Sequence, residues 1–560
     1  MLKKCFRPSE EDADGRRSPT GTKSLGVLGL ASLVFFSVAG SPAGSEDSVA
    51  AGGALWAIVG FLVLPLVWSV PEALITAELS TTFPHNGGFV MWVSEAFGDT
   101  AGYIEGLLKW SSGVLDGAVY PVMMLNYLRK VVPGLRSELV GRIFVVVVTL
   151  ILTWAQYLGL EIVGVTSNVV ILTTMLPFVV LVVWGFPKME WDQVVEGRPL
   201  DQIDWALFLT NLFWNLNYWD SVSTLASEVK NPARTYPRAL AVAMVLTVLM
   251  YVLVIAVAAG NAPPNEAWDN AELADAGVWV AGAWLRIWIV VSVSISTVGL
   301  FLAELSTDIY QLEGMASMGM LPKLFAVKNA HKVPVVALVF EVVLILFIDQ
   351  VAASVEDIIA YEMVGYCAAM VLEFFAFVRL RMTHADIPRP FKTPGGLYAS
   401  IALVVPATLF TVAIMVMSPW NVWVAGGAQA VFAVGVALLC KYFRRTHPEY
   451  FILSPQTSRV IRLMPGRRLP DEVHESLLAQ EKEAEDGQRD LFNPATSPSV
   501  LNFQDGEPAR SHYIEVGAFN DDDSHENAKS TVVTAAARGP IPIPAGPSEG
   551  SDDPEANAAG

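Results

Sequence analysis

The stretch that decides the fold reads Leu212-Phe-Trp-Asn-Leu-Asn-Tyr-Trp-Asp-Ser-Val-Ser-Thr-Leu-Ala-Ser-Glu-Val-Lys-Asn-Pro232. It lies among some dozen long apolar segments, yet it carries amides, aromatic rings and the carboxylate of Asp220. Asn and Asp side chains compete with the helical backbone for hydrogen bonds, and they are costly to bury in hydrocarbon. We therefore expect this segment to face a watery cavity, as it would in a transport protein.

The rest of the chain has the composition of a membrane protein. Of its 560 residues, 53% are apolar and 16% are charged, which is far from the composition of a soluble domain. Apolar runs such as 239–260 and 420–440 match the roughly 20 residues that a helix needs to cross a bilayer. We predict an all-α membrane protein with twelve transmembrane helices, at 24–45, 54–79, 99–128, 140–159, 162–187, 205–226, 237–259, 281–312, 333–349, 354–379, 397–418 and 420–442.

The distribution of Lys and Arg predicts that both termini are cytoplasmic, because positive residues concentrate in cytoplasmic loops. The basic loop at 129–142 is the one exception, and the segment 261–277 is predicted to be an acidic outer loop. Residues 1–23 then form a cytoplasmic tail, and 24–442 form the transporter domain. Residues 443–560 carry much of the net charge of -19 and are rich in Pro, Ser, Gly and Asp, which predicts a disordered cytoplasmic tail.

Two of the predicted spans contain residues that interrupt a helix. The first holds Gly40-Ser41-Pro42-Ala43-Gly44, where Gly weakens the helix and Pro removes a donor, although such residues also form ordinary kinks. The sixth is interrupted at 214–221. Breaks five spans apart are typical of a five-plus-five inverted repeat. We place the repeats at about 24–187 and 205–379, with two further helices at 397–442.

Several motifs occur in order along the chain: Phe83-Pro-His-Asn-Gly-Gly-Phe89, Glu228-Val-Lys-Asn-Pro-Ala-Arg-Thr-Tyr-Pro-Arg-Ala239, Gln311-Leu-Glu-Gly-Met-Ala-Ser-Met-Gly-Met-Leu-Pro322 and Arg389-Pro-Phe-Lys-Thr-Pro394. They resemble landmarks of the amino acid, polyamine and organocation transporter superfamily. Val70-Pro-Glu-Ala-Leu-Ile-Thr-Ala-Glu-Leu79 and Asn215-Leu-Asn-Tyr-Trp-Asp220 resemble more closely its L-type amino acid transporter branch, and within that branch the polyamine uptake transporters of plants and protists.

The resemblance implies a LeuT-like fold and proton-coupled uptake of polyamines such as putrescine and spermidine by alternating access. We expect a multi-pass protein of the plasma membrane, with an endomembrane location as the alternative. Relatives in the light-chain branch are linked to a partner glycoprotein through a cysteine between spans three and four. Residues 129–141 contain no cysteine, so we expect no disulfide-linked heavy chain. We expect no nucleic-acid partner.

The residues at the two breaks and in the third span indicate the chemical class of the substrate. A polyamine has no carboxylate and several ammonium groups, so its site needs carboxylates and aromatic faces, whereas an amino acid carrier needs free backbone amides at a half-helix N-terminus. We predict a substrate site built from both breaks and from the third span, consisting of Gly40, Ser41, Pro42, Gly44, Asp116, Trp214, Asn217, Tyr218, Trp219 and Asp220.

The carboxylates also suggest how transport is coupled. A carboxylate that binds an ammonium when ionised and releases it when protonated would couple the two cations directly, and we predict this role, or gating, for Asp116, Glu304 and Glu362. The proton is thus the expected coupling ion, with no cofactor or metal. A sodium site that includes Ser294, Ser296 or Thr297 is the less favoured alternative.

Structural roles compete with these assignments. Glu46 and Asp47 could be solvated loop charges, and Asp220 could cap the second half of its span. Lys109 and Arg286 could pair with some of the acids.

The sequence also bears on classes of protein other than a polyamine transporter. The sequence lacks the motifs of metalloproteases, intramembrane proteases and phosphate-loop enzymes, so we expect no catalytic residues. A channel, a transport-inactive amine sensor and an amino acid permease of the same superfamily remain as alternatives.

Overall fold

The computed structural model describes residues 25–195, 197–263, 268, 271–351, 355–451, 514–516 and 531–533, and it leaves the side chains of 160–170, 227–228, 449, 514–516 and 531–533 undescribed. The chain divides into two compact units, Met1–His474 and Glu475–Gly560. In the second unit the described residues form two short antiparallel strands, β1 (Ile514–Val516) and β2 (Thr531–Val533). The predicted tails, 1–23 and 443–560, lie mostly outside the described residues.

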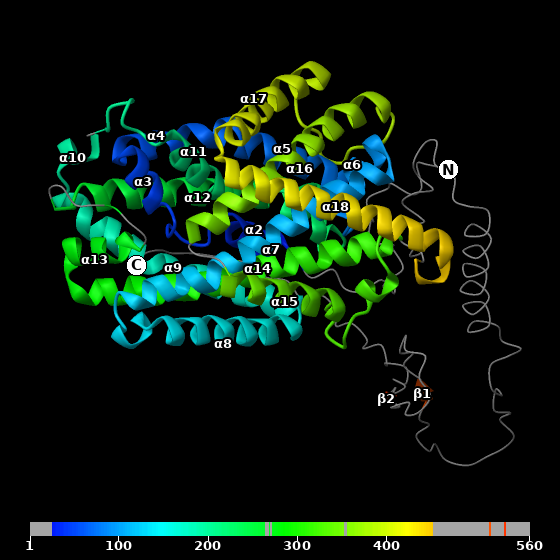
Figure 1. Ribbon diagram of the computed structural model, residues 1–560, viewed down its shortest axis with the longest axis horizontal. Coiled ribbons are helices and arrows are strands. Elements are labelled where there is room, and N and C mark those ends of the chain that lie inside the picture. Colours follow the sequence, from blue (N-terminus) through cyan, green and yellow to red (C-terminus); the bar gives the residue numbers. More distant parts are fainter. Residues whose placement is uncertain are drawn as a thin grey trace, which may run out of the picture. The chain divides into compact units, whose positions relative to one another are not determined.

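The described part of the first unit is helical (Figure 1). Its helices are α2 (Val27–Val38), α3 (Glu46–Gly52), α4 (Ala54–Val67), α5 (Ser69–Thr82), α6 (Gly88–Phe97), α7 (Asp99–Arg129), α8 (Glu138–Tyr157), α9 (Leu160–Gly185), α10 (Trp191–Val195), α11 (Trp205–Trp214), α12 (Pro232–Ala259), α13 (Glu272–Ala281), α14 (Ala283–Ser317), α15 (Val335–Val351), α16 (Val355–Thr383), α17 (Gly396–Met417) and α18 (Trp420–Thr446). Short 3-10 turns are η1 (Pro133–Arg136), η2 (Phe186–Lys188), η3 (Ser221–Glu228), η4 (Lys323–Ala326) and η5 (Pro448–Tyr450).

Each predicted range overlaps a helix, and eight of the described helical segments are long and apolar enough to cross a membrane. The multi-pass character of the chain follows from these eight segments, whereas the number of twelve spans and the inverted repeat stay predictions. The predicted loop 261–277 is wrong over residues 272–277, which belong to α13. Glu272 and Asp275 lie in the first turn of that helix, where negative charge stabilises the N-terminus. The short helix α6 was not predicted.

The helix is interrupted at both predicted places. The first interruption lies between α2 and α3, where Gly40 and Gly44 adopt positive φ angles of 62° and 94°. The second follows α11 and leads into η3, and there Tyr218 has a φ of 65°, which is rare for a residue with a side chain. A chain that leaves helical geometry at these points exposes backbone and side-chain polar groups to the space between the helices.

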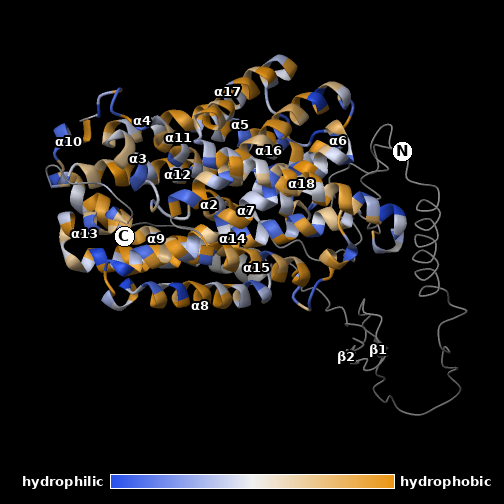
Figure 2. Ribbon diagram, in the orientation of Figure 1, coloured by the Kyte–Doolittle hydropathy of each residue, from blue (hydrophilic) through white to orange (hydrophobic). Residues whose placement is uncertain are grey.

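The two breaks lie in the interior of the helical unit. The long helix α7 packs along α14 and α16, while α2 packs against α9 and α12. Exposed apolar side chains include Ile143 of α8 and Leu409 of α17, and the ribbon of α17 is mostly coloured as hydrophobic (Figure 2). An apolar outer surface fits a protein whose periphery contacts lipid.

Candidate functional site

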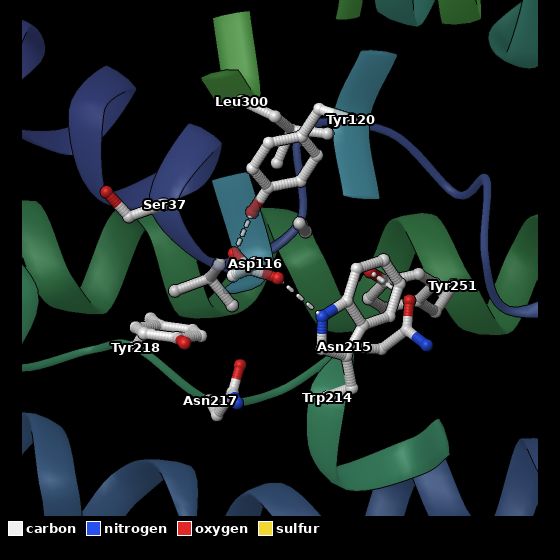
Figure 3. A pocket seen from close by; sticks show the side chains of 11 residues that line it. Ser37, Asp116, Tyr120, Trp214, Asn215, Asn217, Tyr218, Tyr251 and Leu300 are labelled. Carbon is white, nitrogen blue, oxygen red and sulfur yellow. Dashed lines mark hydrogen bonds between the residues drawn. The ribbon is translucent and has the colours of Figure 1, made fainter. Parts of the chain in front are cut away.

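A small cavity lies where the two breaks meet α7 (Figure 3). Helix α2 ends at it, and the segment after α11 closes it from another direction. Its lining residues are Ser37, Val38, Ala39, Asp116, Tyr120, Trp214, Asn215, Asn217, Tyr218, Tyr251 and Leu300. The cavity therefore combines one carboxylate, two amides and four aromatic side chains.

Asp116 supplies the only carboxylate among these lining residues. It is 1% exposed, and the indole Nε1 of Trp214 donates a hydrogen bond of 2.8 Å to its Oδ1 atom. The hydroxyl of Tyr120 donates to the other oxygen, Oδ2. Within the described residues no Lys or Arg forms an ion pair with this carboxylate. Two aromatic donors thus orient an anionic group that has no cationic partner from these parts of the chain.

Asn217 is the second polar group that points to a ligand. Its side chain is fully buried, and neither its amide nitrogen nor its oxygen has a hydrogen-bond partner. A buried polar group left unpaired costs about 1–3 kcal/mol. Since Asn217 lines the cavity together with Asp116 (Figure 3), a polar ligand there would recover that cost.

Asn215 joins the two breaks to each other. Its Nδ2 donates to the carbonyl of Gly44 at 3.2 Å, and its Oδ1 accepts from the hydroxyl of Tyr251 at 2.9 Å. A Cβ atom on Gly44 would lie 2.6 Å from the ring of Trp214, so this position accepts only glycine. The cavity shape therefore depends on both interrupted segments together.

Tyr218 connects the second break to α16. Its backbone N–H donates to the hydroxyl of Tyr366 at 2.9 Å, and its own hydroxyl donates to Glu362 Oε1 at 3.2 Å. These two bonds hold the residue in its left-handed backbone conformation. Movement of α16 would consequently move one wall of the cavity.

The structure brings four of the predicted substrate residues to the cavity, namely Asp116, Trp214, Asn217 and Tyr218. Gly40, Ser41, Pro42 and Gly44 form the first break without lining the cavity. The structure gives only the positions of these residues, and the substrate role of each one stays a prediction.

Trp219 and Asp220 also lie outside the cavity lining, and their substrate role likewise stays a prediction. The indole N–H of Trp219 is already bonded to the carbonyl of Leu216 at 2.8 Å, and its side chain is fully buried in the core. Asp220 forms an ion pair with Lys109. Sequence alone does not show that these acids and rings are already engaged within the protein.

The three residues predicted for coupling or gating lie near one another. Glu362 hydrogen-bonds Tyr218 and also contacts the carboxyl group of Asp116. Glu304 is 1% exposed and has Asp116 and Asp308 as its acidic neighbours. Their role in coupling stays a prediction, as does the sodium alternative.

Other acids have structural partners. The proposal that Glu46 is a solvated loop charge is wrong, since it is 2% exposed and accepts bonds from Tyr127 and from the Gly44 N–H. Asp47 is also buried. Arg286 pairs with Asp275, as Lys109 does with Asp220, so both basic residues do pair with acids.

The cavity also contains residues that were not predicted from the sequence. Tyr120 lies four residues after Asp116, and two residues at this spacing share one face of a helix, so it could have been found. Asn215 lies within the interruption predicted at 214–221, so it too could have been found. Ser37, Tyr251 and Leu300 carried no comparable signal, because their approach depends on how separate helices pack.

Comparison with known proteins shows similarity over most of the chain. A family model described as amino acid permease matches residues 25–438. The polyamine transporter RMV1 of Arabidopsis thaliana is 42% identical over 431 residues, which is 76% of this chain and 87% of that protein. The polyamine transporter PUT1 of Oryza sativa subsp. japonica is 41% identical over 431 residues, covering 76% of this chain and 80% of that protein.

Proposed function

The chain belongs to the amino acid permease family, so it is a multi-pass membrane transporter and not an enzyme, and we propose that its substrate is a polyamine. The observation that carries this proposal is the Asp116 carboxylate at the cavity, held by Trp214 and Tyr120 and without a paired cation from the described residues. A buried carboxylate beside aromatic rings is suited to a primary ammonium group.

Backbone hydrogen bonding at the first break argues against a zwitterionic amino acid. Such a substrate would need free N–H groups to hold its carboxylate. Here the N–H groups of Gly40 and Ser41 bond to carbonyls, that of Ala43 to Ser41 Oγ, and that of Gly44 to Glu46 Oε2 at 2.6 Å. The N–H of Ser45 bonds to a carbonyl as well. The donors that would bind a substrate carboxylate are therefore occupied by the protein itself.

The names of the similar proteins agree with this choice, since RMV1 and PUT1 are described as polyamine transporters. We further propose uptake by alternating access with the proton as coupling ion, through Asp116, Glu304 and Glu362. The proposal also includes twelve spans in a five-plus-five inverted repeat, cytoplasmic termini and a plasma-membrane location. It includes neither a disulfide-linked heavy chain nor a cofactor.

Uptake of labelled putrescine, spermidine, arginine and leucine by cells expressing the chain tests it. The assay is run at acidic and neutral external pH, with and without a proton uncoupler. Saturable putrescine or spermidine uptake that the uncoupler lowers is the expected result. Preferred uptake of arginine or leucine would instead assign an amino acid permease, and flux that does not saturate would indicate a channel.

A further inference from the structure

A buried ammonium group lies on α7 in a cluster that the cavity does not include. Lys109, which is 4% exposed, forms an ion pair with Asp220 and lies 3.4 Å from Glu373 Oε1. Its Nζ atom is also 3.1 Å from the sulfur of Met370. The second break, α7 and α16 therefore converge on this one charge.

Aromatic rings complete the surroundings of this ammonium. Lys109 Nζ lies 4.2 Å from the ring centroid of Tyr366, 5.0 Å from that of Phe89 and 6.0 Å from that of Tyr218. Rings at these distances attract a cation through their faces. We call Asp220, Glu373, Tyr366 and Phe89 the ammonium cage, since together they provide what a primary ammonium needs.

The cage has more acidic groups near it than its single cation can satisfy. Glu72 accepts bonds from the Asp220 N–H and the Tyr366 hydroxyl through Oε1, but its Oε2 has no hydrogen-bond partner. Glu105 is fully buried, and neither of its oxygens has such a partner. Across the described residues, Lys109 is the only Lys or Arg that forms an ion pair with any of the four acids of this cluster, and its two partners are Asp220 and Glu373. The cluster therefore has the capacity to hold a second positive charge.

Glu105 is placed to receive Lys109 if another cation takes the cage. The two residues are four apart on α7, a spacing at which Glu and Lys side chains meet on one face of a helix. Because Glu105 forms no ion pair among the described residues, a move of the Lys109 ammonium to it would keep that ammonium next to a carboxyl group.

The cage is adjacent to the cavity at Asp116. Tyr218 lines that cavity, and its ring is also the one that lies 6.0 Å from Lys109. The ring of Tyr366 packs against that of Tyr218 at a tilt of 54°, with ring centroids 4.7 Å apart, and the Tyr366 hydroxyl donates to Glu72. The side chain of Tyr218 is thus shared between the two sites.

We propose that the ammonium cage is a second ammonium subsite, which Lys109 fills in this structure and which the far ammonium of a diamine or polyamine takes when the near one is at Asp116. Lys109 then pairs with Glu105. The inference rests on the proposed polyamine function and goes beyond it, because it states how the carrier distinguishes a diamine from a monoamine. The terminal ammonium of a polyamine and that of Lys109 have the same chemistry, so one can replace the other.

Binding of labelled putrescine to the purified full chain tests this subsite, with displacement by unlabelled putrescine and by n-butylamine, which has the same carbon chain but one ammonium. The quantity measured is the ratio of the butylamine to the putrescine dissociation constant. Lys109→Met removes the competing ammonium and should raise this ratio by about tenfold, the effect of one charge-assisted contact. Glu373→Gln and Glu105→Gln should lower this ratio, chiefly by weakening the binding of putrescine.

Lys130→Met is the matched control, because Lys130 is also on α7 and also pairs with two acids, Glu272 and Asp275. It should leave the ratio unchanged. An unaltered ratio in both Lys109→Met and Glu373→Gln would overturn the inference. If Lys109→Met does not fold, the ratios of Glu373→Gln and Glu105→Gln decide whether the inference holds. Each of these variants should fold, since it removes an acid from a cluster that has acids in excess. A wild-type chain that binds neither amine would instead refute the proposed function.

Discussion

Replacing Asp116 by Asn should weaken the binding of putrescine while leaving the protein folded. The amide has nearly the same shape as the carboxylate, so its oxygen can accept from the Trp214 indole, and its NH₂ can donate to Tyr120, whose hydroxyl also accepts. What the substitution removes is the negative charge at the cavity. Stability should therefore change little.

The magnitude follows from the kind of contact that is lost. A hydrogen bond to a charged group contributes about 1.5–3 kcal/mol, and each 1.4 kcal/mol is about a factor of ten in affinity. Because Asp116 is buried and has no ion-pair partner among the described residues, a substrate ammonium would supply the whole pair. We expect the dissociation constant for putrescine to rise by roughly 10- to 100-fold.

The assay is displacement of labelled putrescine from purified protein in detergent, with the thermal midpoint measured on the same sample. Asp275→Asn is the control, because Asp275 lies on α13 and pairs with Lys130 and Arg286. It should keep the wild-type affinity. An unchanged dissociation constant in a folded Asp116→Asn protein would refute the assignment of Asp116 as an ammonium contact.

Three further predictions concern stability. Gly44→Ala should destabilise the protein by about 1–3 kcal/mol, because φ is 94° and the new Cβ would lie 2.6 Å from Trp214; a thermal midpoint equal to that of the wild type would contradict this. Arg381→Ala should cost about 1.5–3 kcal/mol, because the buried Glu78 carboxylate loses its charged hydrogen bonds to Arg381 but keeps its ion pair with Arg389. Thermal unfolding in detergent measures the loss, and an unchanged thermal midpoint would contradict it. His85 lies between α5 and α6, and burial lowers its pKa from 6.5 to about 4. Between pH 6.5 and pH 4 the unfolded chain therefore binds more protons than the folded protein does. The free energy of unfolding should accordingly fall as the pH drops from 6.5 towards 4. His85→Gln should make that fall shallower in thermal midpoints taken across this range, and an identical pH profile would exclude His85 as its source.

The long apolar helices were predictable from the sequence because their ends are local. The span predicted at 99–128 is α7 (Asp99–Arg129), and that predicted at 397–418 is α17 (Gly396–Met417). The two interruptions were predictable for the same reason, since Gly, Pro and Asn act on their own backbone. The short helices α6 and α13 were missed because they have fewer residues than a membrane span requires.

The partners of each acid could not be predicted in this way. Asp116 and Asp220 are both carboxylates in apolar surroundings, and nothing local to either tells them apart. Only the packing of α7 against the second break gives Asp220 the Lys109 ammonium and leaves Asp116 at the cavity. The occupation of the first break's amides by Ser41 and Glu46 likewise appears only in three dimensions.

The sequence by itself thus determined that the chain is a membrane protein of long helices, two of them broken, because hydrophobic length and backbone-breaking residues act within a single segment. Tertiary structure decided which buried charges neutralise each other and which one faces the cavity. The physical reason is that electrostatic pairing depends on distances of a few ångströms between residues on different helices, such as Lys109 and Asp220, and these distances are fixed only when the helices pack.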